Sequence, residues 1–287
     1  MVGVIPAAPC LDTRFSFNSS LHSQFPTCTF IPPFPNTPLA LSFTKSTPPT
    51  YSLRDDTASG STMEIAEVEP NSAVKKKAED IASELRGTSI YLVGINSKMK
   101  TSLGKFIAET LRYYFFDSDK LIEEATGGSA AVKSFRERDW KGFRESETEV
   151  LKQLSSMGRL VVSAGNGAFE SPTNLSLLRH GILIWIDIPL DMIAKEAVED
   201  ELQLSELELS PTVSYPEVLD QLTALYKQMQ DGYATADATI SLQKLAQQLG
   251  YDALDAVTEE DMGLEVLKEI ERLMRVKKLM EEAARPF

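Results

Sequence analysis

Short apolar runs rich in β-branched residues alternate with helical segments along most of the chain, and this alternation constrains the fold more than any other feature. The runs expected to form strands lie at residues 89–93, 113–116, 159–164, 182–188 and 238–241. Helical periodicity is found at residues 73–85, 101–112, 120–126, 138–157, 174–179, 216–230, 242–249 and 263–284. Strands that alternate with helices in this way predict an α/β fold with a parallel sheet flanked by helices on both faces.

Glycine or acidic residues follow three of these predicted strands. They are Gly94, the pair Asp117 and Asp119, and the pair Gly165 and Gly167. In parallel sheets the ligands bind beyond the carboxyl ends of the strands. The sequence therefore predicts a functional site where these three loops meet.

Residues 94–101 have the layout of a phosphate-binding loop, with Gly94 after a strand and Lys100-Thr101 at the start of a helix. The full motif G-x-x-x-x-G-K-[ST] has a second glycine where Met99 stands. We expect methionine to be strained in the left-handed conformation such loops use, at about 1–2 kcal/mol, and its side chain to enter the phosphate space. The alternative is an ordinary connection between a strand and a helix.

Three further segments, in order, resemble the shikimate kinase family. They are Phe115–Asp119 with the following residues (FFDSDKLIEE), Phe143-Arg144-x-x-Glu147, and Leu160–Gly167 (LVVSAGNG). The resemblance extends from about Ser89 to the C-terminus and includes the plant enzymes. It implies a P-loop kinase-like fold of the nucleoside monophosphate kinase type.

The resemblance also implies what the matching positions once did. Asp117, with Thr101, would help to position Mg²⁺, and Asp119 would receive the substrate hydroxyl proton, beside the phosphate-loop Lys100. Arg144 would pair with the shikimate carboxylate, and Glu147, one helical turn on, would hold it in place. The alternative for each carboxylate is a helix N-cap or a solvated charge. The substrate-like pocket is expected to comprise Asp119, Arg144, Glu147, Gly165, Asn166 and Gly167.

The residues that depart from the family pattern lie in the segments expected to bind phosphate and to close over the ligands. Ser97 and Met99 replace glycines of the phosphate loop, Asn166 replaces the middle glycine of a Gly-Gly-Gly loop, and Met229 stands where a second carboxylate-binding arginine is expected. We expect Asn166 to be the mildest change, because asparagine tolerates left-handed backbone.

The lid region lacks the arginines that the resemblance implies. Residues 180–271 contain no arginine, and residues 189–216 hold seven acidic residues against Lys195 alone. An arginine that stabilises phosphoryl transfer contributes a factor of about 10³–10⁵ in rate. We therefore expect no catalytic residues, no bound metal and no cofactor, with Thr101 and Asp117 as vestiges of a metal site.

Residues 1–56 differ from the rest in being rich in Ser, Thr and Pro, with three charges of each sign. We interpret them as a disordered plastid transit peptide, residues 57–87 as a linker and leading helix, and residues 88–287 as the shikimate-kinase-like domain. Both cysteines lie in the first segment. The net charge of −13 therefore belongs to a stromal chloroplast domain that we expect to be soluble, with no membrane span and no nucleic-acid partner.

Three functions remain open. The first is a catalytically inactive homologue that serves as a non-enzymatic plastid factor, needed for chloroplast biogenesis, and binds an unknown plastid protein or small ligand. A basic partner at the acidic lid, residues 191–210, is one form of it. The second is an active shikimate kinase that uses Mg-ATP despite a degenerate loop, and the third is a nucleotide sensor that binds ATP without transfer.

Overall fold

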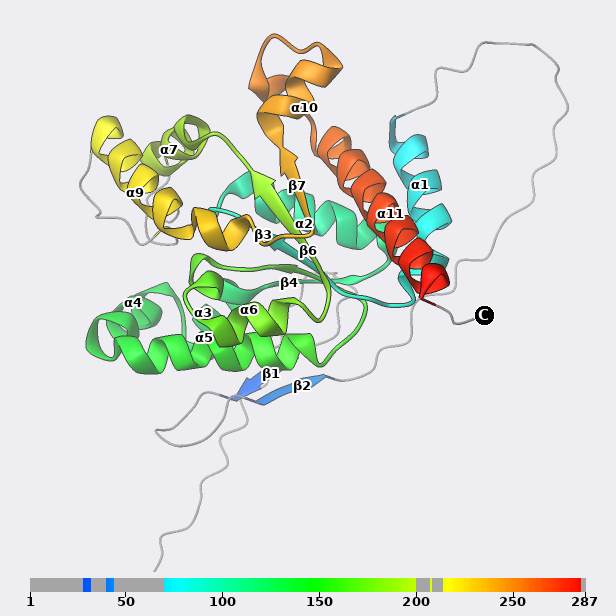
Figure 1. Cartoon of the computed structure of the whole chain (residues 1–287). Coiled ribbons are helices and arrows are strands. Elements are labelled where there is room, and N and C mark those ends of the chain that lie inside the picture. Colours follow the sequence, from blue (N-terminus) through cyan, green and yellow to red (C-terminus); the bar gives the residue numbers. More distant parts are fainter. Residues whose placement is uncertain (1–27, 32–39, 44–69, 200–206, 208–213, 285–287) are drawn as a thin grey trace, which may run out of the picture.

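The computed structural model describes residues 28–31, 40–43, 70–199, 207 and 214–284 (Figure 1). Its main sheet is parallel and has the strand order β4-β5-β3-β6-β7. The strands are β3 (Ile90–Val93), β4 (Tyr114–Asp117), β5 (Leu160–Ser163), β6 (Ile182–Asp187) and β7 (Ala238–Ser241). All five coincide within a residue or two with the runs predicted from the sequence, so the predicted α/β sheet is confirmed.

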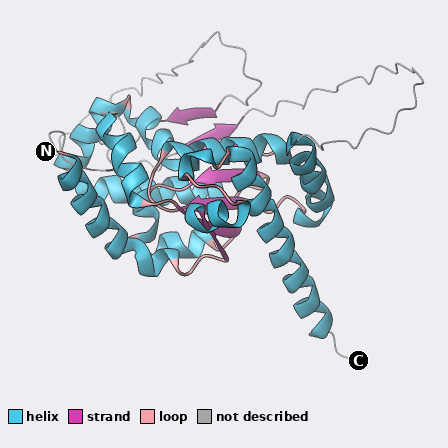
Figure 2. Cartoon of the chain, turned by 90° about the horizontal axis from the view of Figure 1, so that it is seen from above, coloured by secondary structure: helices cyan, strands magenta, loops and turns pink. Residues whose placement is uncertain are grey.

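Helices cover both faces of this sheet. They are α1 (Pro70–Leu85), α2 (Lys98–Leu111), α3 (Ser118–Thr126), α4 (Ser129–Arg138), α5 (Trp140–Ser155), α6 (Pro172–Leu178), α7 (Leu190–Glu199), α9 (Tyr215–Tyr233), α10 (Leu242–Leu249) and α11 (Glu259–Ala283), with the 3₁₀ turns η1 (Asn166–Phe169) and η2 (Leu254–Ala256). Helices α1, α2 and α11 pack together on one side, and α3, α5 and α6 lie on the other (Figures 1 and 2).

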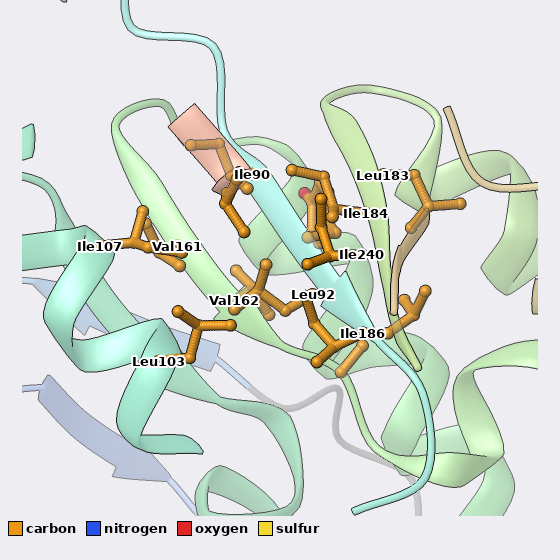
Figure 3. Packing of buried hydrophobic residues seen from close by; sticks show 14 of the residues in the cluster. Ile90, Leu92, Leu103, Ile107, Val161, Val162, Leu183, Ile184, Ile186 and Ile240 are labelled. Atoms are coloured by element: carbon orange, nitrogen blue, oxygen red, sulfur yellow. The ribbon is translucent and has the colours of Figure 1, made fainter. Parts of the chain in front are cut away.

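The core is centred on β3, whose four residues are all buried. Ile90 lies opposite Val161 of β5 and Ile182 of β6, so the strand has a neighbour on each edge. Leu103 and Ile107 of α2 pack over the same sheet (Figure 3). A strand buried on both faces needs a continuous apolar run rather than an alternating one, and IYLV supplies it.

The register brings the three candidate loops to one edge. Leu92 of β3 and Asp117 of β4 both lie opposite Ser163 of β5, so β3, β4 and β5 end near one level. Their following loops begin at Gly94, Asp117 and Ala164. This placement follows from the parallel pairing and agrees with the site predicted at the carboxyl ends.

Several helices differ from the sequence expectation, among them α2, which begins at Lys98 rather than at residue 101, and α1 and α4. Helix α1 begins at Pro70, within the segment expected to be a linker. Helix α4 was not predicted as a separate helix, because none of its residues is buried and its apolar periodicity is weak. Asp139 separates α4 from α5, where its side chain caps the new helix by accepting a hydrogen bond from the Gly142 N–H.

The N-terminal segment contains one described element. Strands β1 (Cys28–Ile31) and β2 (Ala40–Phe43) form an antiparallel pair, which corrects the expectation of a wholly unstructured segment for these eight residues. Thr29, Phe30 and Ile31 of β1 favour β-structure, whereas β2 contains only Phe43 of this kind. The rest of residues 1–56 and the predicted linker up to residue 69 lie outside the described residues.

The acidic lid of residues 191–210 is described only in part. Residues 190–199 form α7, which packs on α9, whereas residues 200–206 and 208–210 lie outside the described residues. Within the described ranges, none of the helices is both long enough and apolar enough to cross a bilayer.

Candidate functional site

The loop after β3 runs from Gly94 to Ser97 and leads directly into α2. Gly94 has a φ of 130°, and a Cβ atom there would lie 2.4 Å from the carbonyl oxygen of Ile186 on β6. Glycine is therefore required both by the backbone conformation and by the close approach. Ser97 is extended, and its hydroxyl accepts a 3.2 Å hydrogen bond from the Lys100 N–H. Ser97 is thus the N-cap of α2.

Met99 lies in the first turn of α2, so the expectation of left-handed strain at this residue is wrong. Among the described residues, positive φ angles outside glycine occur at Arg86, Arg112 and Arg159 alone. The Met99 side chain is half-buried and packs against the core. The helix begins early enough to place Met99 in ordinary helical geometry, after the N-cap Ser97.

Asn166 does not make use of the left-handed backbone that asparagine tolerates. It is the first residue of η1, and its φ is not positive. Its side-chain oxygen accepts a 3.3 Å hydrogen bond from the Asn96 N–H. The side chain therefore connects the loop after β5 to the loop after β3.

Lys100 is completely buried. Its ammonium donates hydrogen bonds to the Gly94 carbonyl at 3.0 Å, the Asn96 side-chain oxygen at 2.7 Å and the Ala164 carbonyl at 2.8 Å. An ammonium group has three hydrogens to donate. Each of them therefore has an acceptor within the protein.

Asn96 connects all three loops, although no sequence pattern singles it out. Its amide nitrogen donates a 2.7 Å hydrogen bond to Oδ2 of Asp119, while its oxygen receives the bond from Lys100. The Asn96 side chain thus lies between the phosphate-loop lysine and the second acid of the DSD segment. Finding it required the tertiary structure, because a lone asparagine in a loop has no distinctive pattern.

The DSD segment begins α3. The Asp117 carboxylate accepts hydrogen bonds from the N–H groups of Asp119 and Lys120, at 3.1 and 3.3 Å, and so serves as the N-cap. The Ser118 hydroxyl accepts a 2.9 Å hydrogen bond from the Gly165 N–H. A Cβ atom on Gly165 would lie 1.9 Å from Oδ1 of Asp119, so any other residue here would require this carboxylate to move.

A cleft of about 410 Å³ opens beside these groups. It is lined by Thr101, Asp117 and Asp119 and also by Asn96, Lys133 and Arg136, whereas Arg144 and Gly167 of the expected substrate-like pocket line a separate hollow. Arg136 of α4 lies over the ring of Phe143, with its Cζ atom 4.7 Å from the ring centroid. Arg136 lies on α4, which the sequence does not predict as a separate helix.

Arg144 is held by two carboxylates. Its Nη1 donates to Oε2 of Glu147 at 2.7 Å, and its Nη2 donates to Oε1 of Glu170 at 2.6 Å. The guanidinium also lies over the Trp140 ring, 4.0 Å from the centroid. The expected contact with Glu147 is present, whereas Glu170, which follows η1, was not predicted. A Cβ atom on Gly167 would lie 2.0 Å from Nη1 of Arg144, so any other residue here would require the guanidinium to move.

Met229 is buried within the core, on the face of α9 that carries Tyr233. The Tyr233 ring packs edge-on against Phe169 at 5.0 Å and stacks on Trp185 at 5.6 Å. Burial raises the pKa of the Tyr233 hydroxyl. An apolar and aromatic cluster therefore occupies the region where a second carboxylate-binding arginine was expected.

The described part of the acidic lid reaches the start of α2. The Glu196 carboxylate of α7 accepts a 3.3 Å hydrogen bond from the Lys98 N–H. The first N–H groups of a helix are its anion-binding groups. At this helix start, the protein's own Glu196 and Ser97 accept two of those hydrogen bonds.

The parallel sheet, the loop from Gly94 to Lys100-Thr101 at the start of α2, and the acidic pair Asp117 and Asp119 at the end of β4 together define a P-loop kinase-like α/β protein. Comparisons with known proteins support this class of fold. The sequence model described as shikimate kinase matches residues 98–260. A solved shikimate kinase from Bacteroides thetaiotaomicron shares the fold, with a TM-score of 0.51 at 23% identity over 64% of this chain and 98% of that one.

Two plant proteins are similar over most of their length. "Probable inactive shikimate kinase like 1, chloroplastic" of Arabidopsis thaliana is 56% identical over 83% of this chain and 82% of that protein. "Shikimate kinase 3, chloroplastic" of Oryza sativa is 39% identical over 72% of each. The chain belongs to the shikimate kinase family.

Proposed function

We propose that this chain is a member of the shikimate kinase family that has no kinase activity and serves as a non-enzymatic factor in the plastid. The observation that carries the proposal is the environment of Lys100. The ammonium group is fully buried, and three protein oxygens accept its hydrogen bonds. A lysine so engaged supports the architecture of the loops rather than a phosphate group.

Binding a phosphate would require Lys100 to leave these acceptors. In a working phosphate loop the lysine reaches the β- and γ-phosphates. Here that movement would leave the Gly94 and Ala164 carbonyls without their charged donor, at about 1–3 kcal/mol for each buried acceptor. Ser97 and Glu196 also accept hydrogen bonds at the helix start where phosphate oxygens would bind. The residues present therefore do not fit Mg-ATP, and we derive no step through it.

The remaining departures point the same way. Met229 is a core residue, and residues 180–271 supply no arginine that could stabilise a transferring phosphoryl group. The described part of the lid supplies a carboxylate instead. The printed name of the Arabidopsis relative, "Probable inactive", agrees with this proposal.

The plastid location is part of the proposal. The names of both plant relatives describe them as chloroplastic, and residues 1–56 have the composition of an import signal. We place the protein in the stroma and propose a role in chloroplast biogenesis through an unidentified plastid protein or small ligand. Import of the radiolabelled chain into isolated chloroplasts, followed by fractionation, tests the location. Recovery of the chain outside the stroma would contradict it.

The negative charge of the acidic lid, residues 191–210, supports a role in which this lid binds a basic partner. Only its described part, residues 190–199, contributes structural evidence. Variants that neutralise Glu199, Asp200 and Glu201 should lose function in plants and lose partners in pulldowns from plastid stroma. Full function of the neutralised variant would eliminate this partner site.

A coupled assay with shikimate and Mg-ATP tests the absence of activity. The purified protein should show no turnover above background, with the rice shikimate kinase as positive control. It should also fail to rescue a bacterium that lacks shikimate kinase. Turnover at the rate of an ordinary small-molecule kinase would refute the proposal.

Active shikimate kinase remains the second candidate. The retained Lys100, Thr101, Asp117, Asp119 and Arg144 favour it, together with 39% identity to the rice enzyme. In that case Mg-ATP would be the cofactor, and Thr101 and Asp117 would hold the metal. The same assay separates the two candidates.

Calorimetry with millimolar ATP and ADP tests the nucleotide-sensor alternative, and we expect no binding.

A further inference from the structure

We propose that Glu170 occupies, on Arg144, the place of a ligand carboxylate, and that the pocket thereby excludes carboxylate ligands and favours uncharged ones. This inference rests on the proposed function, because it specifies which ligands a non-catalytic pocket can retain. Glu170 was not among the residues that the sequence suggested. Its contact with Arg144 is a property of this chain's own side chains.

The two carboxylates on Arg144 have different surroundings. Glu147 belongs to the same helix, one turn away, and its side chain is only 8% exposed. Glu170 comes from the residue after η1, and its side chain is 28% exposed. Glu147 is therefore the fixed partner that orients the guanidinium. Glu170 occupies the more accessible of the two positions, where an incoming carboxylate would compete with it.

The guanidinium has little freedom to turn toward another anion. Trp140 covers one of its faces at 4.0 Å, and Gly167 approaches Nη1 so closely that a Cβ atom would collide. These contacts fix the plane of the guanidinium, and Glu147 fixes one end of it. The edge formed by Nη2 is where Glu170 binds. A planar fork of donors held in this way recognises a carboxylate well, and here the carboxylate is internal.

A ligand could reach this edge. Arg144, Glu170, Gly167 and Asn174 line a hollow of about 350 Å³ between α5 and α6. The Arg144 side chain is 17% exposed. The guanidinium is therefore not sealed from solvent, and occupation by Glu170 rather than inaccessibility closes it to a carboxylate.

Repulsion between negative charges makes the pocket exclude carboxylate ligands but not uncharged ones. Arg144 carries one positive charge, and its two partners carry two negative charges. A third carboxylate would have to displace Glu170 and remain beside it, and two like charges at one site repel each other. A ligand with an amide or hydroxyl in place of the carboxylate would not meet this repulsion. Replacing Glu170 with glutamine keeps the shape and the hydrogen-bonding oxygen but removes the charge.

Calorimetry on the full chain with two probes tests the proposal. The probes are shikimate and its uncharged carboxamide, and the variants are Glu170→Gln and, as a matched control, Glu265→Gln in an exposed ion pair with Lys268. Glu170→Gln should bind shikimate at least about tenfold more tightly than the wild type, the size of one charge-assisted hydrogen bond. Affinity for the carboxamide should change less than about twofold, and the control should match the wild type.

Equal shikimate affinity in the wild type and Glu170→Gln would overturn the proposal, as would equal gains for both probes. Nitrogen-15 spectra of the Arg144 side chain provide a second test on the wild type, which does not depend on the variant folding. Shikimate should leave these resonances unshifted, whereas a shift at saturation would show that the ligand has displaced Glu170.

Failure of this inference and failure of the proposed function are distinguishable. Turnover of shikimate by the wild type would refute the proposed function, whatever the affinity ratio between the wild type and Glu170→Gln. Tight shikimate binding by the wild type without turnover would refute the role of Glu170 and leave the proposed function intact.

Discussion

The Nζ atom of Lys100 donates a 2.8 Å hydrogen bond to the carbonyl oxygen of Ala164, which joins the first turn of α2 to the end of β5. The two residues are 64 positions apart in the chain. Together with the bonds to Gly94 and Asn96, this contact makes Lys100 a buried crosslink between two of the three loops. A phosphate-loop lysine that bound nucleotide would have to be available to its ligand.

Replacing Lys100 with methionine should lower the free energy of unfolding by about 3 kcal/mol, because buried carbonyl acceptors lose their charged donor. Urea unfolding followed by circular dichroism measures this. Lys105→Met is the matched control on the exposed side of the same helix, and it should change stability by less than about 0.5 kcal/mol. A Lys100→Met variant as stable as the wild type would show that the crosslink contributes little.

Gly94 should tolerate no side chain. Alanine there would be forced into a positive φ and against the Ile186 carbonyl, so we expect Gly94→Ala to lose about 3 kcal/mol or more of stability. Gly250→Ala is the control, because Gly250 also has a positive φ but would place its Cβ in open space. That variant should lose only about 1–2 kcal/mol, the conformational cost alone. Equal losses in thermal unfolding would mean that the contact with β6 does not matter.

Restoring glycines to the phosphate loop should not restore catalysis. The double variant Ser97→Gly, Met99→Gly recovers the motif, yet residues 180–271 still supply no arginine for the transition state. We expect shikimate phosphorylation to stay at background in the coupled assay. The protein should also lose about 1 kcal/mol of stability, because Met99 lies within a helix. Measurable turnover would show that the loop alone limits activity.

Much of the fold was predictable because its signals are local. The buried strands appear as continuous apolar runs, and parallel pairing then brings Gly94, Asp117 and Gly165 to one edge. The contact between Arg144 and Glu147 was predictable for the same reason, since a spacing of three residues places both on one helix face.

The unpredicted features depend on contacts between distant residues. Asn96 and Glu170 take their roles from partners 70 and 26 positions away, which no local pattern encodes. Met99 is a different case, because a local sequence signal for its helical conformation was present. Ser97 is a favoured N-cap residue three positions before Lys100 and indicates a helix start at residue 98. The match to the phosphate-loop motif took precedence and led to the wrong expectation of strain.

Lowering the pH should weaken the contact between α1 and α11. Lys77 of α1 pairs with Glu271 of α11, and this hydrogen bond holds the pKa of Glu271 below its usual value of 4.5. A lowered pKa in the folded state means that the pair contributes stability above pH 4.5. This contribution is lost as the pH falls through the lowered pKa.

Lys77→Met should therefore be less stable than the wild type at pH 7, and the difference should shrink as the pH falls below about 4.5. Urea unfolding at several pH values between 7 and 3 measures this, with Lys278→Met on the exposed part of α11 as the control. A difference that stays constant with pH would show that the contact of the Lys77 stem, rather than its charge, stabilises the pair.

Tyr233 provides a test of whether the region around Met229 is a closed core. Its hydroxyl is buried and has no hydrogen-bond partner among the described residues, while its ring packs on Phe169 and Trp185. Tyr233→Phe keeps the ring contacts and removes an unsatisfied polar group, so stability should rise by about 1 kcal/mol. Tyr251→Phe, at an exposed ring, should stay within about 0.5 kcal/mol of the wild type. A gain would support a closed apolar cluster around Met229. A loss would contradict it, because it would show that the buried hydroxyl makes a stabilising contact.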